Sequence, residues 1–172
     1  PETDPYFAGA LENSKGAVLD STGDKRGALG KYRCALDILG SSRSRAAREM
    51  EAVVHSNIGL ASAALGLGDE ALSEYETALR LQRQFGESNA AALTLMNEGG
   101  VHYSRDRLDD AFRCFDFARQ VFELHGDRVH LAMALNALGG VFATANDRAT
   151  ALDFYEKARE LRLAVGDPRG LA

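Results

Sequence analysis

Apolar residues recur at helical spacing along residues 135–167, LNALGGVFATANDRATALDFYEKARELRLAVGD, with polar and charged residues between them. This pattern predicts amphipathic helices. Two adjacent glycines, Gly139 and Gly140, interrupt the apolar positions. Because a glycine inside a helix costs about 0.5–1 kcal/mol relative to alanine, these positions are expected to require a small residue.

Small and aromatic residues repeat along the chain with a period of 40 residues. The series are Gly59, Gly99 and Gly139; Ala71, Ala111 and Ala151; Tyr75, Phe115 and Tyr155; Ala78, Ala118 and Ala158; and Gly86, Gly126 and Gly166. An earlier copy with Gly16, Ala28, Tyr32 and Ala35 joins this register after an insertion near Ser41 to Arg45. A fixed period of this length indicates an array of stacked repeats, here in four copies.

Each copy predicts two helices joined by a short turn. STGDK, GLGDE, SRDRLD and TANDRA lie between the helices of a pair, whereas GES, GDR and GDP lie between successive pairs. A glycine can end a helix there in the left-handed conformation, and Ser or Asp can cap the next helix. The predicted pairs are 5–21 with 24–40, 44–65 with 69–85, 88–104 with 108–125, and 128–145 with 148–165.

The order of residues within each copy resembles the tetratricopeptide repeat. LGGVF with ALDFYEKA, IGLAS with ALSEYETA, and EGGVHY with AFRCFDFA match that family's pattern, while KGAVL with ALGKYRCA matches least well in its first helix. The resemblance implies an all-α fold, a right-handed α-solenoid of about four stacked antiparallel helix pairs. The small positions would then be the places where paired helices approach closely.

The resemblance also predicts the domain organisation. A single repeat domain would cover residues 5–172, with repeats at about 5–43, 44–87, 88–127 and 128–167. Residues 168–172 would begin a further repeat that is cut short. Because the chain starts without Met and stops where a fifth repeat would begin, we expect it to be a piece of a longer protein.

The long period and the recurrent Gly-Asp endings are similar to the long-repeat branch of this family, which includes kinesin light chains and the Leu-Gly-Asn spindle-orientation scaffolds. Members of this branch are binding modules. Their first helices line a concave groove that receives a peptide or a helix of a partner protein. The resemblance therefore implies a protein-interaction module without catalytic activity and without a cofactor.

The groove implied by the resemblance contains an asparagine in every repeat. Family members use such asparagines to hold the main chain of the ligand, and an amide suits this role because it donates and accepts without the burial of a charge. Asn57 and Asn97 occupy equivalent positions and are the strongest candidates, with solvated surface residues as the alternative. The candidate groove residues are Asn13, Val53, Asn57, Leu60, Leu93, Met96, Asn97, Tyr103, Met133 and Asn136.

The lining of this candidate groove is mostly apolar or neutral. It has no Lys or Arg at the positions that form a carboxylate clamp in chaperone-binding relatives, which disfavours an acidic C-terminal motif as the ligand. A segment with apolar anchors at helical or extended spacing fits better. Val53, Leu60 and Leu93 could instead belong to the core between repeats.

The net charge indicates which class of partner is not expected, and the cysteine spacing indicates the cellular compartment. The net charge of −5 leaves no surplus of Lys and Arg for phosphate contacts, so a nucleic-acid partner is not expected. No apolar run approaches the roughly 20 residues that span a bilayer. Cys34 and Cys114 have neither disulfide-framework nor zinc-ligand spacing, which favours a reducing, cytoplasmic setting.

Motifs for catalysis or metal binding are weak. GLGDEA at 66–71 fits a dinucleotide-binding pattern formally, but a helix precedes it where a strand is required, so it is interpreted as a turn. His125 and His130 are five residues apart and lack the i, i+4 spacing of zinc ligands on one helix. No metal site is predicted.

Some residues depart from the family pattern. Lys15 and Glu98 stand where the family usually has Leu, and displaced helices or unusual contacts are expected there. His102 replaces an aromatic residue and is interpreted as a partly buried packing residue. Cys34 and Cys114 are expected to be small packing residues in similar environments on second helices.

Two classes of function remain. The first is the interaction module that captures a peptide or helix in its groove. The second is a structural scaffold, or a self-associating segment, that uses repeat ends and convex surfaces to build a larger assembly or a homo-oligomer. Groove substitutions would weaken binding in the first class and leave association unchanged in the second.

Overall fold

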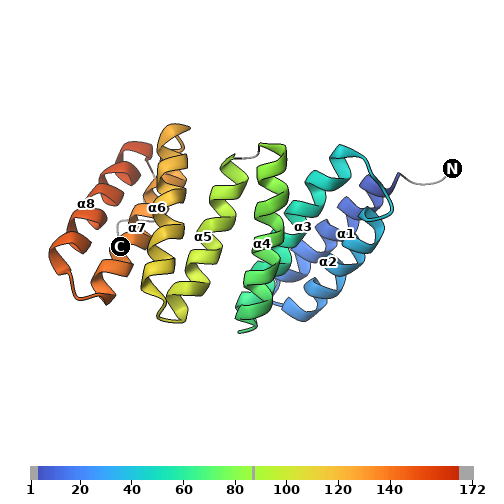
Figure 1. Ribbon diagram of the computed structural model, residues 1–172, viewed down its shortest axis with the longest axis horizontal. Coiled ribbons are helices and arrows are strands. Elements are labelled where there is room, and N and C mark those ends of the chain that lie inside the picture. Colours follow the sequence, from blue (N-terminus) through green and yellow to red (C-terminus); the bar gives the residue numbers. More distant parts are fainter. Residues whose placement is uncertain (1–3, 87, 167–172) are drawn as a thin grey trace. The chain divides into compact units, whose positions relative to one another are not determined.

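The computed structural model describes residues 4–86 and 88–166, and this part of the chain forms eight helices and no strand (Figure 1). The helices are α1 (Pro5–Ser21), α2 (Lys25–Leu39), α3 (Arg45–Ala64), α4 (Gly68–Phe85), α5 (Ser88–Ser104), α6 (Leu108–Leu124), α7 (Arg128–Thr144) and α8 (Arg148–Val165). The chain is therefore an all-α helical repeat, and the eight helices fit four helix pairs. The predicted further repeat at 168–172 lies outside the described residues.

The helices belong to two compact units. Unit 1 contains α1 to α4, in which successive helices pack on one another and α1 also lies against α3. Unit 2 contains α5 to α8, in which successive helices again pack on one another. Each unit thus holds two of the predicted helix pairs.

Within each pair, the repeated glycine of the first helix faces the repeated aromatic ring of the second helix. A Cβ atom added to Gly59 would lie 2.5 Å from Tyr75 Cε1, and one added to Gly99 would lie 2.6 Å from Phe115 Cε1. The same contact joins Gly16 to Tyr32 and Gly139 to Tyr155. The prediction that paired helices approach closely at these glycines is therefore confirmed, and the group that requires the space is an aromatic ring.

Gly140 does not have this role. A Cβ atom there would lie 3.7 Å from its nearest neighbour, Tyr103 Oη, which is an ordinary van der Waals distance. The close approach of paired helices therefore requires a glycine at Gly139 and not at Gly140.

The turns within pairs share one backbone feature. Gly23, Gly66, Asp106 and Asn146 occupy the same register position, and all have positive φ, between 58° and 93°. Glycine adopts this left-handed conformation without steric cost, and Asp and Asn tolerate it better than most other residues. The turn geometry is therefore maintained although the residue type changes between repeats.

Side chains of acidic and hydroxyl residues begin most of the helices. Asp24, Ser44, Asp127 and Asp147 each accept a hydrogen bond from a backbone N–H in the first turn. The helices α4 and α6 have no such bond, but each carries two acidic residues in the first turn, which favour the positive end of the helix dipole.

Each unit has its own apolar core. In unit 1, Ala28, Tyr32, Leu39, Val54 and Ile58 are buried between α1, α2 and α3 with several small residues. In unit 2, a cluster of Ala111, Phe115, Leu138 and Val141 joins α6 to α7. These cores fix the orientation of the first helices and hence the side chains that those helices expose.

Candidate functional site

The predicted groove residues lie on the first helices of both units. Asn13, Val53, Asn57 and Leu60 come from α1 and α3 in unit 1, and we call them the unit 1 face. Leu93, Met96, Asn97, Tyr103, Met133 and Asn136 come from α5 and α7 in unit 2, and we call them the unit 2 face.

An amide pair connects the two helices of the unit 1 face. The Asn57 Nδ2 group donates a hydrogen bond of 2.9 Å to Asn13 Oδ1, and both side chains are half-buried. Val53 and Leu60 lie four residues before and three residues after Asn57, so they share its side of α3. They are 40% and 44% exposed.

A tyrosine connects the two helices of the unit 2 face. The Tyr103 hydroxyl lies 2.7 Å from Thr144 Oγ1 and donates a 3.3 Å hydrogen bond to the Gly140 carbonyl. The open space beside Gly140 therefore accommodates a ring from the neighbouring first helix. Leu93 and Met133 are 39% and 48% exposed on this face.

The amides of the unit 2 face are not paired as those of unit 1 are. Asn97 is half-buried and Asn136 is exposed, and neither makes a side-chain hydrogen bond within the described residues. Met96 is half-buried and packs against the core cluster of unit 2, so its contribution is mainly to packing.

The exposures decide one question that the sequence left open. Val53, Leu60 and Leu93 could have been core residues between repeats, yet each exposes about two fifths of its side chain. They are surface residues in the described structure. An apolar side chain on the surface is common by itself, but here the apolar residues flank amides on the same helix faces.

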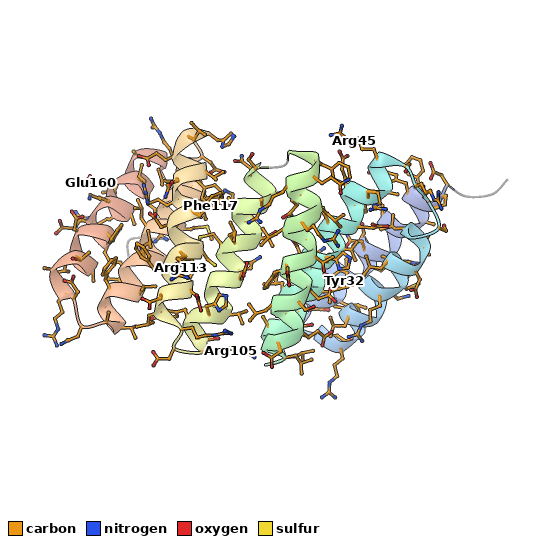
Figure 2. The ribbon with its side chains drawn as sticks, viewed as in Figure 1. Tyr32, Arg45, Arg105, Arg113, Phe117 and Glu160 are labelled. Atoms are coloured by element: carbon orange, nitrogen blue, oxygen red, sulfur yellow. The ribbon has the colours of Figure 1, made fainter. Side chains whose placement is uncertain are left out.

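A hollow between α6, α7 and α8 of unit 2 was missed from the sequence. The Phe142 ring stacks on the Phe154 ring at 5.5 Å between centroids and meets the Phe112 ring edge-on at 5.8 Å. Charged side chains of α6, α7 and α8, including Arg119, Glu123, Arg128 and Lys157, surround this aromatic floor. Arg113 and Phe117 are exposed on the surface of α6 and do not line the hollow (Figure 2).

A cluster of Glu98, His102 and Cys114 was also missed. These residues come from α5 and α6 of unit 2, and their carboxylate, imidazole and thiol groups lie within 4.8 Å of one another. Burial, followed by the negative charges of Glu98 and Asp110, raises the pKa of the Cys114 thiol to about 12. The sequence analysis identified Glu98 and His102 as departures from the repeat pattern but did not connect them with Cys114.

Other predictions about single residues have mixed outcomes. Lys15 is exposed and its ammonium group bonds to Glu12 one turn earlier, which is an ordinary ion pair on a helix surface. His102 is buried, as expected, but Cys34 is exposed whereas Cys114 is buried, so the prediction of similar environments for the two cysteines is wrong. The difference follows from register, because Cys34 lies beyond the aromatic Tyr32 and Cys114 lies just before Phe115.

His125 and His130 do not form a joint site. The His125 Nδ1 atom lies 2.8 Å from the Val121 carbonyl, and the His130 Nδ1 atom lies 2.7 Å from Asp127 Oδ2. The stretch GLGDEA connects α3 to α4, as the interpretation of a turn predicted. None of the described helices is long and apolar enough to cross a membrane.

Comparison with known families gives a match over part of the chain. The family model of the tetratricopeptide repeat matches residues 90–164, which lie within unit 2. A comparison with curated protein sequences finds no match.

Several solved structures share the fold. BtubC (BKLC) from P. vanneervenii is 24% identical with a TM-score of 0.85, over 96% of this chain and 67% of that one. Aspartyl phosphate phosphatase F from Bacillus subtilis is 17% identical with a TM-score of 0.91, over 98% of this chain. A putative kinesin light chain of Podospora anserina with nearly identical TPR-like repeats is 11% identical with a TM-score of 0.58, over 96% of this chain and 99% of that one.

These likenesses establish the fold. The chain spans 44% of the length of the Bacillus phosphatase.

Proposed function

Because the chain carries tetratricopeptide repeats, we propose that it binds a segment of a partner protein on the first-helix faces of its two units. Such repeats serve as protein-interaction modules in general, and their stacked helices create extended binding surfaces. We further propose where on the chain the ligand binds and which chemical groups it presents.

The observation that carries the proposal is the exposure of large apolar side chains beside amides on these faces. Val53 and Leu60 flank Asn57 in unit 1, and Leu93 lies one turn before Asn97 in unit 2. Covering such side chains with apolar groups of a ligand contributes about 25 cal/mol per Å² removed from water. The amides can then hold main-chain groups of the ligand.

The absence of charge on the ten face residues indicates the class of ligand. None of them is acidic or basic, so the faces offer no ion pair to a carboxylate or phosphate. We propose a peptide or helix with apolar anchors, and a role in binding without catalysis. A helical ligand would present anchors at i, i+3, i+4 and i+7.

The experiment begins with selection of peptide ligands for the 172-residue chain from a displayed random library. The affinity of a selected peptide is then measured by fluorescence anisotropy for wild type and for Val53→Ser/Leu60→Ser and Leu93→Ser/Met133→Ser. Loss of an apolar anchor is expected to weaken binding by at least about tenfold in the unit that holds the peptide. The control is Leu152→Ser on α8, since Leu152 is 60% exposed and lies on a second helix.

Unchanged affinity in both first-helix variants, together with weakened binding in the Leu152→Ser control, would contradict the proposal. Circular dichroism of each variant separates loss of binding from loss of folding. The side chains changed are all more than one third exposed, so their replacement is expected to leave the helices intact.

A second candidate function is assembly through the hollow between α6, α7 and α8 and through exposed side chains of α6. The aromatic hollow of unit 2 supports it, together with Phe117, which is 51% exposed, and Leu124, which is 82% exposed. Light scattering after size exclusion, over a wide range of concentrations, tests self-association. A monomer throughout would reject a homo-oligomer, whereas a dimer that Phe117→Ser abolishes would favour this function.

A further inference from the structure

Unit 2 contains three residues that differ in chemistry from their counterparts in the next repeat. Glu98, His102 and Cys114 correspond in the 40-residue register to Leu138, Phe142 and Phe154, which are all apolar. Repeat 3 therefore has three potential ligand groups where repeat 4 has an apolar contact between its helices.

The three groups converge although they come from two helices. Glu98 and His102 are one turn apart on α5, and Cys114 lies on α6, which packs against α5. The distance from Glu98 Oε1 to His102 Nε2 is 3.5 Å, and the three ligand atoms all lie within 4.8 Å of one another.

The burial of the His102 imidazole is only weakly compensated. His102 and Cys114 are each 9% exposed, and His102 Nδ1 has no hydrogen-bond partner within the described residues. A buried polar group without a partner is unfavourable because it has lost its hydrogen bonds to water. The 3.5 Å separation between the carboxylate and the imidazole exceeds the usual N–H···O hydrogen bond, so this contact compensates only weakly.

We propose that Glu98, His102 and Cys114 form a zinc site that connects α5 to α6. Carboxylate oxygen, imidazole nitrogen and thiolate sulfur are the three donor types that Zn²⁺ takes from proteins. Zn²⁺ bonds of about 2.0–2.3 Å in a tetrahedron place neighbouring ligand atoms about 3.3–3.8 Å apart. The distance from Glu98 Oε1 to His102 Nε2 falls in that range, and the ligand atom of Cys114 lies within 4.8 Å of those of Glu98 and His102.

A water molecule is the fourth ligand of the Zn²⁺ ion in this proposal. The Asp110 carboxylate on α6 lies one turn before Cys114, is not part of the cluster, and contacts Arg113 at 3.6 Å. Bound Zn²⁺ replaces the proton of the Cys114 thiol and the weak contact between Glu98 and His102. Its effect is to hold the two helices of repeat 3 together.

The contact in repeat 2 provides an internal comparison. Glu74 corresponds to Cys114, and its carboxylate lies 2.6 Å from His55 Nδ1, which is an ordinary hydrogen bond. That pair is complete without a third group. A nucleophilic role for Cys114 is also disfavoured, because a reactive cysteine has an accessible thiolate and this thiol is buried.

The test uses the 172-residue chain without a histidine tag, freed of metal by a chelator and titrated with Zn²⁺ in a calorimeter. The background variant Cys34→Ser/His125→Gln removes an exposed cysteine and an exposed histidine and serves as the matched control. We expect this control to bind one Zn²⁺ per chain with wild-type affinity and to gain in Tm on binding. Cys114→Ala and His102→Phe should weaken binding at least about a hundredfold, since loss of a ligand exceeds the loss of an outer-shell partner.

A second readout uses Co²⁺, whose bond to a thiolate produces a near-ultraviolet charge-transfer absorption. This absorption should persist in the control and disappear in Cys114→Ala. If Cys114→Ala does not fold, Glu98→Leu replaces it, because Leu138 holds the same position in repeat 4. Equal Zn²⁺ binding by all variants, or the absence of a Zn²⁺ effect on the Tm of the control, would overturn the proposal.

Discussion

At the scale of single residues, the glycine and the aromatic ring of each repeat act as one packing unit. The ring of Tyr75 occupies the space that a side chain on Gly59 would need, and the same relation holds for Tyr155 and Gly139. This explains why a residue with poor helix propensity recurs in the interior of first helices. The entropic cost of glycine is offset by burial of a large ring.

Gly139 and Gly140 offer a test of this explanation within one helix. Gly139→Ala should lower the free energy of unfolding by about 1–3 kcal/mol, because the new methyl group meets the Tyr155 ring. Gly140→Ala should raise it by about 0.5–1 kcal/mol, because the site is open and alanine is the better helix former. Urea denaturation followed by circular dichroism measures both, and equal effects of the two substitutions would contradict the explanation.

The residues that depart from the repeat pattern show what sequence could not predict. The register identified Glu98 and His102 as unusual because it compares each position with its counterparts in other repeats. The register could not predict that Cys114 lies beside Glu98 and His102, because that contact depends on the rotation of α6 against α5. Cysteine also fits a small packing position, so its type gave no separate signal.

At the scale of helices, the ends and the connections between helices were the most predictable features. Turn sequences and capping residues specify where each helix begins, and the structure places the predicted helices within a few residues of their expected bounds. Contacts between neighbouring first helices were less predictable. The bond between Asn57 and Asn13 depends on how α3 lies against α1, which the repeat spacing does not determine.

The two strongest asparagine candidates are therefore expected to differ in their effect on stability. Asn97→Ala should leave the free energy of unfolding unchanged or slightly higher, because Asn97 has no side-chain hydrogen bond within the described residues and alanine favours the helix. Asn57→Ala should be less stable than Asn97→Ala by about 0.5–1.5 kcal/mol, because it loses the bond to Asn13. A double-mutant cycle of Asn13→Ala and Asn57→Ala isolates that bond, and a coupling energy of zero would refute it.

The cap of α8 predicts a pH dependence. Hydrogen bonds from the Thr150 hydroxyl and the Thr150 backbone N–H lower the pKa of Asp147. The stabilisation is therefore fully present above the pKa of the unfolded carboxyl, about 3.9, and is lost as the pH falls through the lower pKa of the folded state. The stability difference between wild type and Asp147→Ala should be constant near neutral pH and shrink below about pH 4.

The matched control for this prediction is Ser44→Ala at the start of α3. The Ser44 hydroxyl accepts a hydrogen bond from the Ala47 N–H and does not titrate in this range. Its contribution, measured by urea denaturation at the same pH values, should not change with pH. An Asp147→Ala difference that stays constant down to pH 3 would count against a role of the carboxylate charge.

At the scale of the whole molecule, the repeat period was sufficient to predict the fold. Four copies of one pattern specify helix pairs, and the family match at residues 90–164 agrees with that prediction. The positions of the first-helix residues followed from the same register, whereas their exposure did not. Val53, Leu60 and Leu93 have apolar side chains that suit a core or a binding surface equally well, and only the packing of neighbouring helices distinguishes the two.

The measurement that tests the central claim most directly is a map of backbone amide resonances of the ¹⁵N-labelled chain with and without a selected peptide. It needs no substitution and reports on all eight described helices at once. Binding through the first-helix faces predicts the largest shifts in α1 and α3, or in α5 and α7, around Asn57 or Asn97. Shifts concentrated around the aromatic hollow, in α6, α8 and the part of α7 near Phe142, with none around Asn57 or Asn97, would contradict the claim and favour the hollow as the binding surface.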